Sequence, residues 1–430
     1  MGPLLFIFVN EPKLIEMVLN SPKCLEKSFL YKFLRLDKGL LAAKHESWQV
    51  HRKLLESSFH LDTVKNFIPI FIDSADQMIS NINALEEKNN VNLFEITSRC
   101  ALTMVLSSSF GLSAAEVHIS DDMLKSVEEL IKIISHRCRE PVFYIERIYR
   151  FTRNYYREKK YRKRCYYYLD QVLKERRELV EPPNKNMCGP STPFKQHDEE
   201  MGDPTLVPKK NFIDQLIFNE GKFSDEEIHD HIYTFVVAGY ETTALQTAFT
   251  LLLLAMHDDV QNKLFEEIEK ALPNKHSILD HSTLMKMKYL ENVIKESMRL
   301  LPPVPLIGRE TLEDLELDEV IVPKGVTLII HFFNLHRKKE IWGDDAEEFN
   351  PDRFSSENEN KRHPYSFLPF SGGSRDCIGK HYAMLAVKTI LVKFLRNYKV
   401  STDLKYDELT FRADITMKVC QDLKVNIEER

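Results

Sequence analysis

One cysteine in the C-terminal part of the chain lies where its sequence context favours a thiolate. Cys377 belongs to the segment FSGGSRDCIG, residues 370–379, where a glycine-rich loop leads into an amphipathic helical pattern. Backbone N–H groups at the start of a helix stabilise an adjacent anion, and the glycines allow the loop to pass close to a flat ligand. Arg375 can reach an anionic group on such a ligand. The segment therefore indicates a functional thiolate.

Two other interpretations of Cys377 stay open from the residues alone. Most free cysteines are buried structural residues. Cys377 and His381 also lie one helical turn apart, as two zinc ligands can, but no second pair completes a four-ligand site.

A second polar feature interrupts a helical pattern that is otherwise apolar. The segment from Ser224 to about His257 begins with a capping box formed by Ser224 and Glu227. Within it, the run AGYETT at 238–243 contains a glycine, a carboxylate and two threonines, which are poor helix formers. Such residues can be tolerated on a solvated face. Because the flanking residues predict a helix buried nearly all round, a buried acid and hydroxyl need partners or a purpose.

The combined pattern resembles the cytochromes P-450, the haem-thiolate monooxygenases. Their cysteine loop reads F-x-x-G-x-R-x-C-x-G, and Phe370, Gly373, Arg375, Cys377 and Gly379 all match it. The resemblance implies that Cys377 is the axial iron ligand, since thiolate ligation raises electron density on iron and promotes O–O cleavage. It also implies that Arg375 pairs with a haem propionate.

The same resemblance makes the run at 238–243 an oxygen-binding groove. It implies that Thr242 hydrogen-bonds dioxygen or its water, and that Glu241 helps to relay protons, as general acid catalysis requires. Ala238 and Gly239 are expected to leave room for the oxygen ligand. Several hydroxylases of this kind carry a glutamate at the position of Ala238 that can bind haem covalently. The alanine therefore predicts a noncovalently held haem b.

Further propionate contacts are expected near the start of the chain. Trp48 and Arg52 have the family's W-x-x-x-R spacing, which places two donors on one helix face and suits a propionate. By itself this pair is more typical of core packing plus a surface charge. Arg309 is another propionate candidate from the same comparison.

The resemblance also implies a structural ion-pair network. Glu296 and Arg299 share one helix face at i and i+3, a spacing that is common in surface pairs of small energy. In the family, such a pair joins a second arginine, here Arg353, and fastens the cysteine loop to the core. We expect this role to be structural, not catalytic.

Composition and periodicity predict one large domain over residues 1–430, mainly α-helical with small β-sheets; the resemblance implies the haem-thiolate monooxygenase fold. The chain is 43% hydrophobic and 29% charged, with only 13 glycines, as expected of a helical globular protein. Helices are predicted at about 12–20, 224–257, 258–272, 283–300 and 377–398, with strands at 4–9 and 326–332. The aperiodic stretch 181–210 is predicted to be a mobile loop.

Several classes of function and location are disfavoured by charge and cysteine use. A net charge of -6 gives no support to nucleic-acid binding. The odd number of scattered cysteines predicts a reducing compartment, and no apolar run is long enough for a spanning helix. Members of this branch have an N-terminal anchor before the first strand, so we expect a short form or an incomplete N-terminus.

The C-terminal half resembles the microsomal branch, which includes fatty-acid ω-hydroxylases and many insect enzymes. This implies dioxygen, a lipophilic small-molecule substrate and an NADPH-dependent flavoprotein reductase at the cytosolic face of the endoplasmic reticulum. The segment 144–168 is rich in tyrosine, arginine and lysine and suits peripheral membrane contact, although a solvated helix face explains it equally well. The apolar pocket is expected to include Val304, Leu306, Ile307 and residues 415–417.

Two other functions remain under consideration. One is a haem-thiolate isomerase or dehydratase that acts on a peroxide, against which the pair Glu241 and Thr242 argues. The other is a non-catalytic haem-binding form that lacks its N-terminal part.

Overall fold

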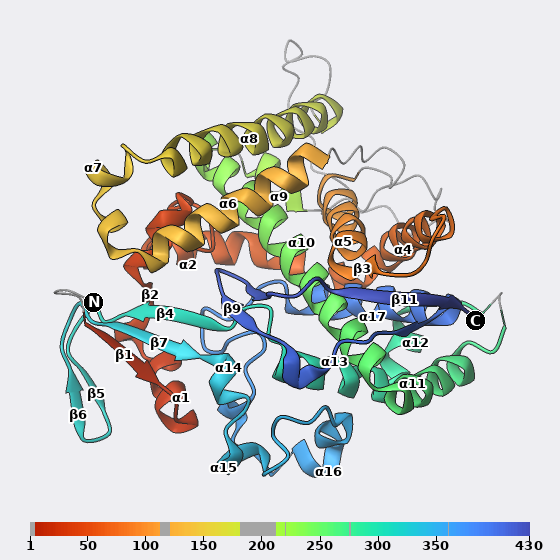
Figure 1. Ribbon diagram of the computed structural model, residues 1–430. Helices are drawn as coiled ribbons and strands as arrows, with labels where there is room; N and C mark the ends of the chain where they lie inside the picture. Colours follow the sequence, from red (N-terminus) through yellow and green to blue (C-terminus); the bar gives the residue numbers. More distant parts are fainter. Residues whose placement is uncertain (1–4, 112–120, 181–211, 220, 275–276, 360) are drawn as a thin grey trace, which may run out of the picture.

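The computed structural model describes residues 5–111, 121–180, 212–219, 221–274, 277–359 and 361–430, and Figure 1 shows their arrangement. The predicted loop at 181–210 lies outside these residues. The described part is mostly helical, with small sheets at one side and along the C-terminal segment, as the sequence predicts.

Helix α10 (Asp225–Met256) runs through the middle of the molecule (Figure 1). It begins at the predicted capping box, where the N–H of Glu227 donates to Ser224 Oγ and the Glu227 carboxylate accepts from the N–H of Ser224. It packs against α5 (Leu93–Phe110), α13 (Lys288–Leu300) and α17 (Lys380–Asn397). Because most of its residues are buried, α10 is the core element that positions the candidate groove.

The other helices form a shell around α10. Helices α6 and α8 pack against each other and lie across the top of the view in Figure 1, with the α7 turn between them at one edge. The longer helices of the shell are α1 (Pro12–Asn20), α2 (His45–Leu55), α4 (Ile68–Asn83), α6 (Asp121–Arg139), α8 (Arg153–Val180), α9 (Phe212–Phe218), α11 (Asp258–Ala271) and α12 (His281–Lys286). The single-turn helices are α3 (Leu61–Val64), α7 (Glu146–Tyr149), α14 (Phe332–Leu335), α15 (Lys339–Trp342) and α16 (Ser356–Glu359).

A four-stranded sheet has the order β1-β7-β4-β2. Strand β1 (Phe6–Val9) runs parallel to β7 (Thr327–His331), which pairs antiparallel with β4 (Leu306–Glu310), and β4 pairs with β2 (Glu26–Lys27). This sheet thus joins the N-terminal segment to residues 306–331, and it places Lys27 directly opposite Arg309.

Smaller sheets complete the fold. A three-stranded sheet has the order β3-β11-β8, and two hairpins are formed by β5 with β6 and by β9 with β10. Their bounds are β3 (Val91–Asn92), β5 (Leu315–Leu317), β6 (Val320–Val322), β8 (Tyr398–Ser401), β9 (Phe411–Ala413), β10 (Met417–Val419) and β11 (Lys424–Glu429).

Two predicted boundaries differ from the structure. The helix expected at 283–300 is divided at Met287, whose φ of -78° and ψ of 84° are not helical, into α12 and α13. The last helix begins at Lys380 and not at Cys377, so the cysteine lies in the loop that precedes the helix.

The predicted ion-pair network is confirmed, and it is completely enclosed. Arg299 Nε and Nη2 donate to the two carboxylate oxygens of Glu296 at 2.7 and 2.8 Å, and Arg353 Nε lies 3.4 Å from Glu296 Oε1. Arg299 also donates to the carbonyls of His336, Ala346 and Glu348. Since buried charged groups are costly unless they are paired and hydrogen-bonded, the full bonding of Arg299 can hold the 336–350 segment firmly.

The network reaches the cysteine loop through one histidine. His336 Nε2 accepts from the backbone N–H of Leu368 at 3.0 Å, just ahead of the segment that carries Cys377. Burial lowers the pKa of His336 to about 3, which keeps this ring neutral and able to accept that bond. The fold therefore positions the cysteine through the same network that stabilises α13.

Arg299→Ala should destabilise the protein by about 3–5 kcal/mol, because it leaves the buried Glu296 carboxylate without its partner. Urea unfolding measures the loss. The control is Lys263→Ala, which removes an ion pair to Asp352 whose side chains are 52% and 63% exposed and should cost less than about 1 kcal/mol. Equal losses in the two variants would contradict the structural importance of the network.

Candidate haem-thiolate site

Cys377 lies at the end of a tightly bonded loop. Its N–H donates to the carbonyl of Phe370 at 3.0 Å, which folds the loop back on itself. The N–H of Gly379 bonds to the sulfur, and a Cβ at Gly379 would lie 3.9 Å from Sγ. Phe370 and Gly379 thus orient the thiol through their backbones.

Opposing effects act on the pKa of the Cys377 thiol, and together they raise it. Burial raises the pKa of the Cys377 thiol and Asp376 adds to the increase, whereas the N–H of Gly379 and the charges of Arg52 and Lys380 lower the pKa. A metal cation bound to the sulfur would supply the further charge that a thiolate needs.

Gly373 has a packing role, and the contact with a flat ligand expected of it stays a prediction. Its φ is +71°, and a Cβ there would lie 2.0 Å from the backbone oxygen of Leu19. Only glycine fits this position, because both the backbone conformation and the close approach to α1 exclude a side chain. The glycine therefore fastens the cysteine loop to the N-terminal part of the chain.

Arg375, Arg309 and Lys27 form a group of inward-facing positive charges, which we call the cation cluster. Arg375 and Arg309 are 6% and 2% exposed. Burial lowers the pKa of Arg309 and lowers that of Arg375 to about 10, and it lowers the pKa of Lys27 well below its usual value. Repulsion from Arg309 also lowers the pKa values of Arg375 and Lys27. The side chains therefore repel one another in a poorly solvated space.

Within the described ranges, no carboxylate lies at ion-pair distance from the cation cluster. Arg375 donates from Nη2 to the carbonyl of Ala43 at 3.0 Å, but its buried Nε and Nη1 have no partner. Arg309 donates only to the carbonyl of Gly308, at 3.2 Å. Because buried unpaired charges are costly, the cluster fits an anionic ligand with more than one acceptor group, and the two propionates of haem meet this requirement.

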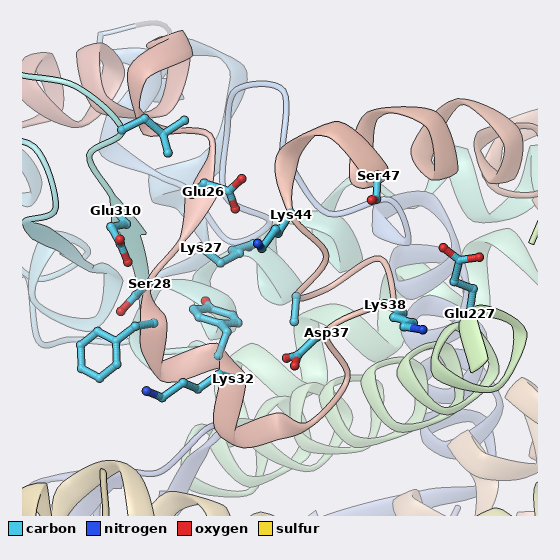
Figure 2. A pocket seen from close by; sticks show the side chains of 14 residues that line it. Glu26, Lys27, Ser28, Lys32, Asp37, Lys38, Lys44, Ser47, Glu227 and Glu310 are labelled. Atoms are coloured by element: carbon cyan, nitrogen blue, oxygen red, sulfur yellow. The ribbon is translucent and has the colours of Figure 1, made fainter. Parts of the chain in front are cut away.

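Lys27 was not identified from the sequence, in which no motif surrounds it. It also lines a cavity of about 620 Å³ on the outer side of the cluster. Figure 2 shows Lys27 and Lys44 extending toward one another in this cavity, with Glu26 above them. Antiparallel pairing of β2 with β4 brings Lys27 to Arg309, and only that pairing could have revealed it.

Trp48 lies beside the cluster as expected, but Arg52 does not. The Arg375 guanidinium lies 4.5 Å from the centre of the Trp48 ring. Arg52 instead donates to the carbonyl of Asp376 at 3.0 Å and to its carboxylate at 2.9 Å. In this structure Arg52 holds the residue next to Cys377, and its propionate contact stays a prediction.

The candidate groove faces open space at two of its positions. Ala238 is exposed and Thr242 half-buried, although α10 is otherwise buried around them. Cys377 also keeps accessible surface within its enclosed loop. Gly239 differs from the expectation, because its missing Cβ would lie 3.1 Å from Val105 of α5. Gly239 therefore allows close helix packing, and Ala238 is the position of the groove that is exposed.

The two polar residues of the groove have different partners. Thr242 Oγ1 donates to the carbonyl of Ala238 at 2.8 Å, which leaves its lone pairs able to accept. Glu241 is 2% exposed and accepts from Lys418 Nζ at 2.7 Å and from Thr416 Oγ1 at 3.2 Å. The acid of the groove is thus held by the β9–β10 hairpin, which the sequence did not indicate.

The expected apolar lining comes from two neighbouring clusters. Val304 and Ile307 pack with the core of the four-stranded sheet, whereas Ile415 and Met417 pack with the main core around α10. The N–H of Met417 donates to the carbonyl of Pro303 at 2.8 Å, which brings the two groups into contact at the end of α13.

The zinc interpretation of Cys377 and His381 gains no support. Over the described ranges, no cluster of three or more His, Cys, Asp or Glu side chains could hold a metal ion. The same residues also include no helix that is both long and apolar enough to cross a membrane.

Comparisons with known proteins agree with these features. The family profile described as Cytochrome P450 matches residues 1–421. Probable cytochrome P450 313a4 of Drosophila melanogaster is 32% identical over 430 residues, which are 97% of this chain and 83% of the relative. Cytochrome P450 4V2 of Rattus norvegicus is 29% identical over 436 residues, which are 100% of this chain and 81% of the relative.

A solved structure shares the fold. The haem domain of a cytochrome P450DA mutant superimposes with a TM-score of 0.79, over 99% of this chain and 88% of that one, at 21% sequence identity.

Lys27→Met should have opposite effects on the haem-free and haem-loaded protein. Without haem, the substitution removes repulsion within the cation cluster and should therefore raise the melting temperature. In the unsubstituted haem-free protein, the free energy of unfolding should rise as the pH increases from the lowered pKa of Lys27 to 10.5, because the unfolded state binds more protons there. Lys27→Met should abolish this rise. With haem, it should weaken haem binding about tenfold, as expected for one lost charge-assisted hydrogen bond. Melting curves and haem transfer to apomyoglobin measure the two effects.

The matched control is Lys44→Met, which removes an exposed lysine that lines the same cavity but is not a member of the cation cluster. A destabilised haem-free Lys27→Met protein, or equal haem retention in both variants, would contradict an anion site at the cation cluster.

Proposed function

The chain belongs to the cytochrome P450 family, and from this premise we propose that Cys377 binds the iron of a noncovalent haem b in a monooxygenase that acts on a lipophilic small molecule. Membership of the family makes the protein an oxidoreductase of the monooxygenase class. The observation that supports the site assignment is the solvent-accessible Cys377 thiol in an enclosed loop beside a cation cluster without a carboxylate partner.

We propose that Arg375, Arg309 and Lys27 hold the haem propionates and that Trp48 supports the Arg375 guanidinium. When bound, haem supplies the iron at which dioxygen is activated. The backbones of Phe370 and Gly379 keep the sulfur in position. In this proposal, side chains bind the propionates of the cofactor, whereas backbone groups position the cysteine that binds its iron.

We propose that Thr242 and Glu241 manage protons on the distal side. The Thr242 hydroxyl lies on the partly exposed face of α10, and its lone pairs can accept from a water in the groove. The bonds from Lys418 and Thr416 hold Glu241 through Oε1 and its side chain is 3% exposed, so loosening of these bonds would let the carboxylate turn toward that water. Ala238 keeps the space beside Thr242 free of side-chain atoms.

The proposed partners follow from the same assignment. Electrons would come from an NADPH-dependent flavoprotein reductase at the cytosolic face of the endoplasmic reticulum, and nucleic acid has no role. Peripheral membrane contact is supported by exposed apolar side chains between α6 and α8, where Phe151 is 89% exposed. The others in this segment are Val142, Ile145 and Ile148. Val304, Leu306, Ile307 and residues 415–417 are proposed to line the substrate pocket.

An isomerase or dehydratase acting on a lipid peroxide is a second candidate, because Glu241 is held away from solvent by the hairpin. Turnover distinguishes the two functions. A monooxygenase requires NADPH, reductase and dioxygen, whereas product formation from a lipid hydroperoxide without them would establish the second candidate.

Thr242→Ala should keep the haem spectrum but lower the product formed per NADPH by about tenfold or more, since it removes the hydroxyl that positions a water for proton transfer and positioned proton transfer contributes at least that factor. Parallel measurements of NADPH consumption, peroxide and product give this ratio. Thr243→Ala is the control, because Thr243 lies next in the helix but is buried. Unchanged coupling in Thr242→Ala would remove Thr242 from the proton path.

Acidified organic solvent should extract haem from the purified protein, because Ala238 cannot form an ester to a haem methyl. Haem that stays with the protein after extraction would show a covalent link and contradict the assignment of noncovalent haem b.

A further inference from the structure

The β9–β10 hairpin contacts two elements that lie on different sides of it. Its strands pair Met417 with Ala413 and Lys418 with Arg412, and a tight turn over residues 414–416 joins them, closed by the N–H of Asp414 donating to the carbonyl of Thr416 at 3.2 Å. Figure 1 shows β9 near the centre of the molecule, beside α10. The hairpin is therefore placed to connect the core helix with the outer shell.

The turn of the hairpin binds the end of α6. Arg139, the last residue of α6, forms an ion pair with Asp414, whose side chain is 1% exposed. The backbone N–H of Ile415 donates to Ser135 Oγ at 3.1 Å, one helical turn earlier. Because one contact uses charge and the other a backbone group, the turn is fixed to α6 in both position and direction.

The second strand of the hairpin binds Glu241. Lys418 of β10 and Thr416, the last residue of the turn before it, both donate to Glu241 Oε1. Lys418 Nζ also lies 4.7 Å from the centre of the Phe94 ring of α5. These contacts fix the acid of the groove to the same hairpin that holds α6.

Charge pairing within the hairpin makes its contacts with α6 and its contacts with Glu241 depend on each other. Lys418 and Arg412 lie directly opposite in the hairpin, an arrangement of like charges that is unfavourable unless each charge is compensated. Arg412 is compensated by Asp414 at 3.2 Å, and Lys418 by Glu241 at 2.7 Å. Loss of either carboxylate contact therefore weakens the strand pairing that supports the other.

We propose that the β9–β10 hairpin couples the position of α6 to the bonds that hold Glu241, with Lys418 and Asp414 as positioning residues. Displacement of α6 breaks the contacts of Asp414 and Ile415, loosens the hairpin and frees the Glu241 carboxylate. The mechanical link rests on the contacts alone, whereas its consequence for proton transfer rests on the proposed function. In that function, movement of α6 makes the acid available to the groove.

Hydrogen exchange on the haem-loaded protein tests the link without turnover. Lys418→Met removes a bond at the Glu241 end, and the amides of residues 136–140 at the α6 end are then followed by mass spectrometry. Coupling predicts that these amides exchange at least about threefold faster, as loss of a contact that secures a helix end allows more local opening. Unchanged exchange at residues 136–140 would overturn the proposal.

The matched control is Lys424→Met, which removes the ion pair of Lys424 with Asp422 on neighbouring β11 and should leave α6 exchange unchanged. If both variants accelerate amide exchange at residues 136–140 equally, the substitutions destabilise the protein in general and the proposal fails. Thr416→Val removes only the 3.2 Å bond to Glu241 and serves if Lys418→Met does not fold.

The rate of 4-phenylimidazole release gives a second, independent result. Arg139→Gln and Lys418→Met should each speed release of this haem ligand about threefold, and the double variant should add little to either, because both cut one link. If the release rate of the double variant rises by the product of the two single-variant factors, the two sites act independently and the coupling is contradicted. A protein without a thiolate haem spectrum would instead contradict the proposed function, while the hydrogen-exchange result would still decide the link.

Discussion

The structure depends on a positive charge that it does not neutralise by itself. Lys27, Arg309 and Arg375 approach one another in a poorly solvated space, and no described carboxylate lies at ion-pair distance from any of them. Isolated buried charges are among the most costly features a folded protein can carry. An anionic ligand would offset this cost, which is why we propose that the cation cluster binds the cofactor.

The same chain shows how a purely structural buried arginine differs. Arg299 is fully buried, and its guanidinium donates to both oxygens of Glu296 and to several backbone carbonyls. Arg375 leaves Nε and Nη1 without partners. The fully bonded Arg299 holds the segment that leads to the cysteine loop. The unpaired donors of Arg375 are the groups that we propose bind the ligand. Cys377 combines both features, because backbone groups orient its side chain while the thiol stays accessible to a ligand.

The sequence predicted those features that depend on local pattern. The capping box at Ser224 and the long core helix agree with the structure, because spacing along one element determines both of them. The Glu296 network also agrees, but the family resemblance, not local spacing, indicated that Arg353 joins it. Features that depend on contacts between distant segments were missed. Lys27 reaches the site only through the pairing of β2 with β4, and Glu241 meets Lys418 from the last part of the chain. Gly239 and Gly373 matched the motif, yet their surroundings give both a packing role.

The central claim is that the Cys377 thiolate, beside the cation cluster, binds haem iron. The carbon monoxide difference spectrum of the reduced, purified protein tests it most directly, because the position of the Soret band reports the ligand on the opposite side of the iron. The account predicts the red-shifted band of a thiolate ligand. A band typical of a neutral thiol or of histidine, or no stoichiometric haem at all, would contradict it.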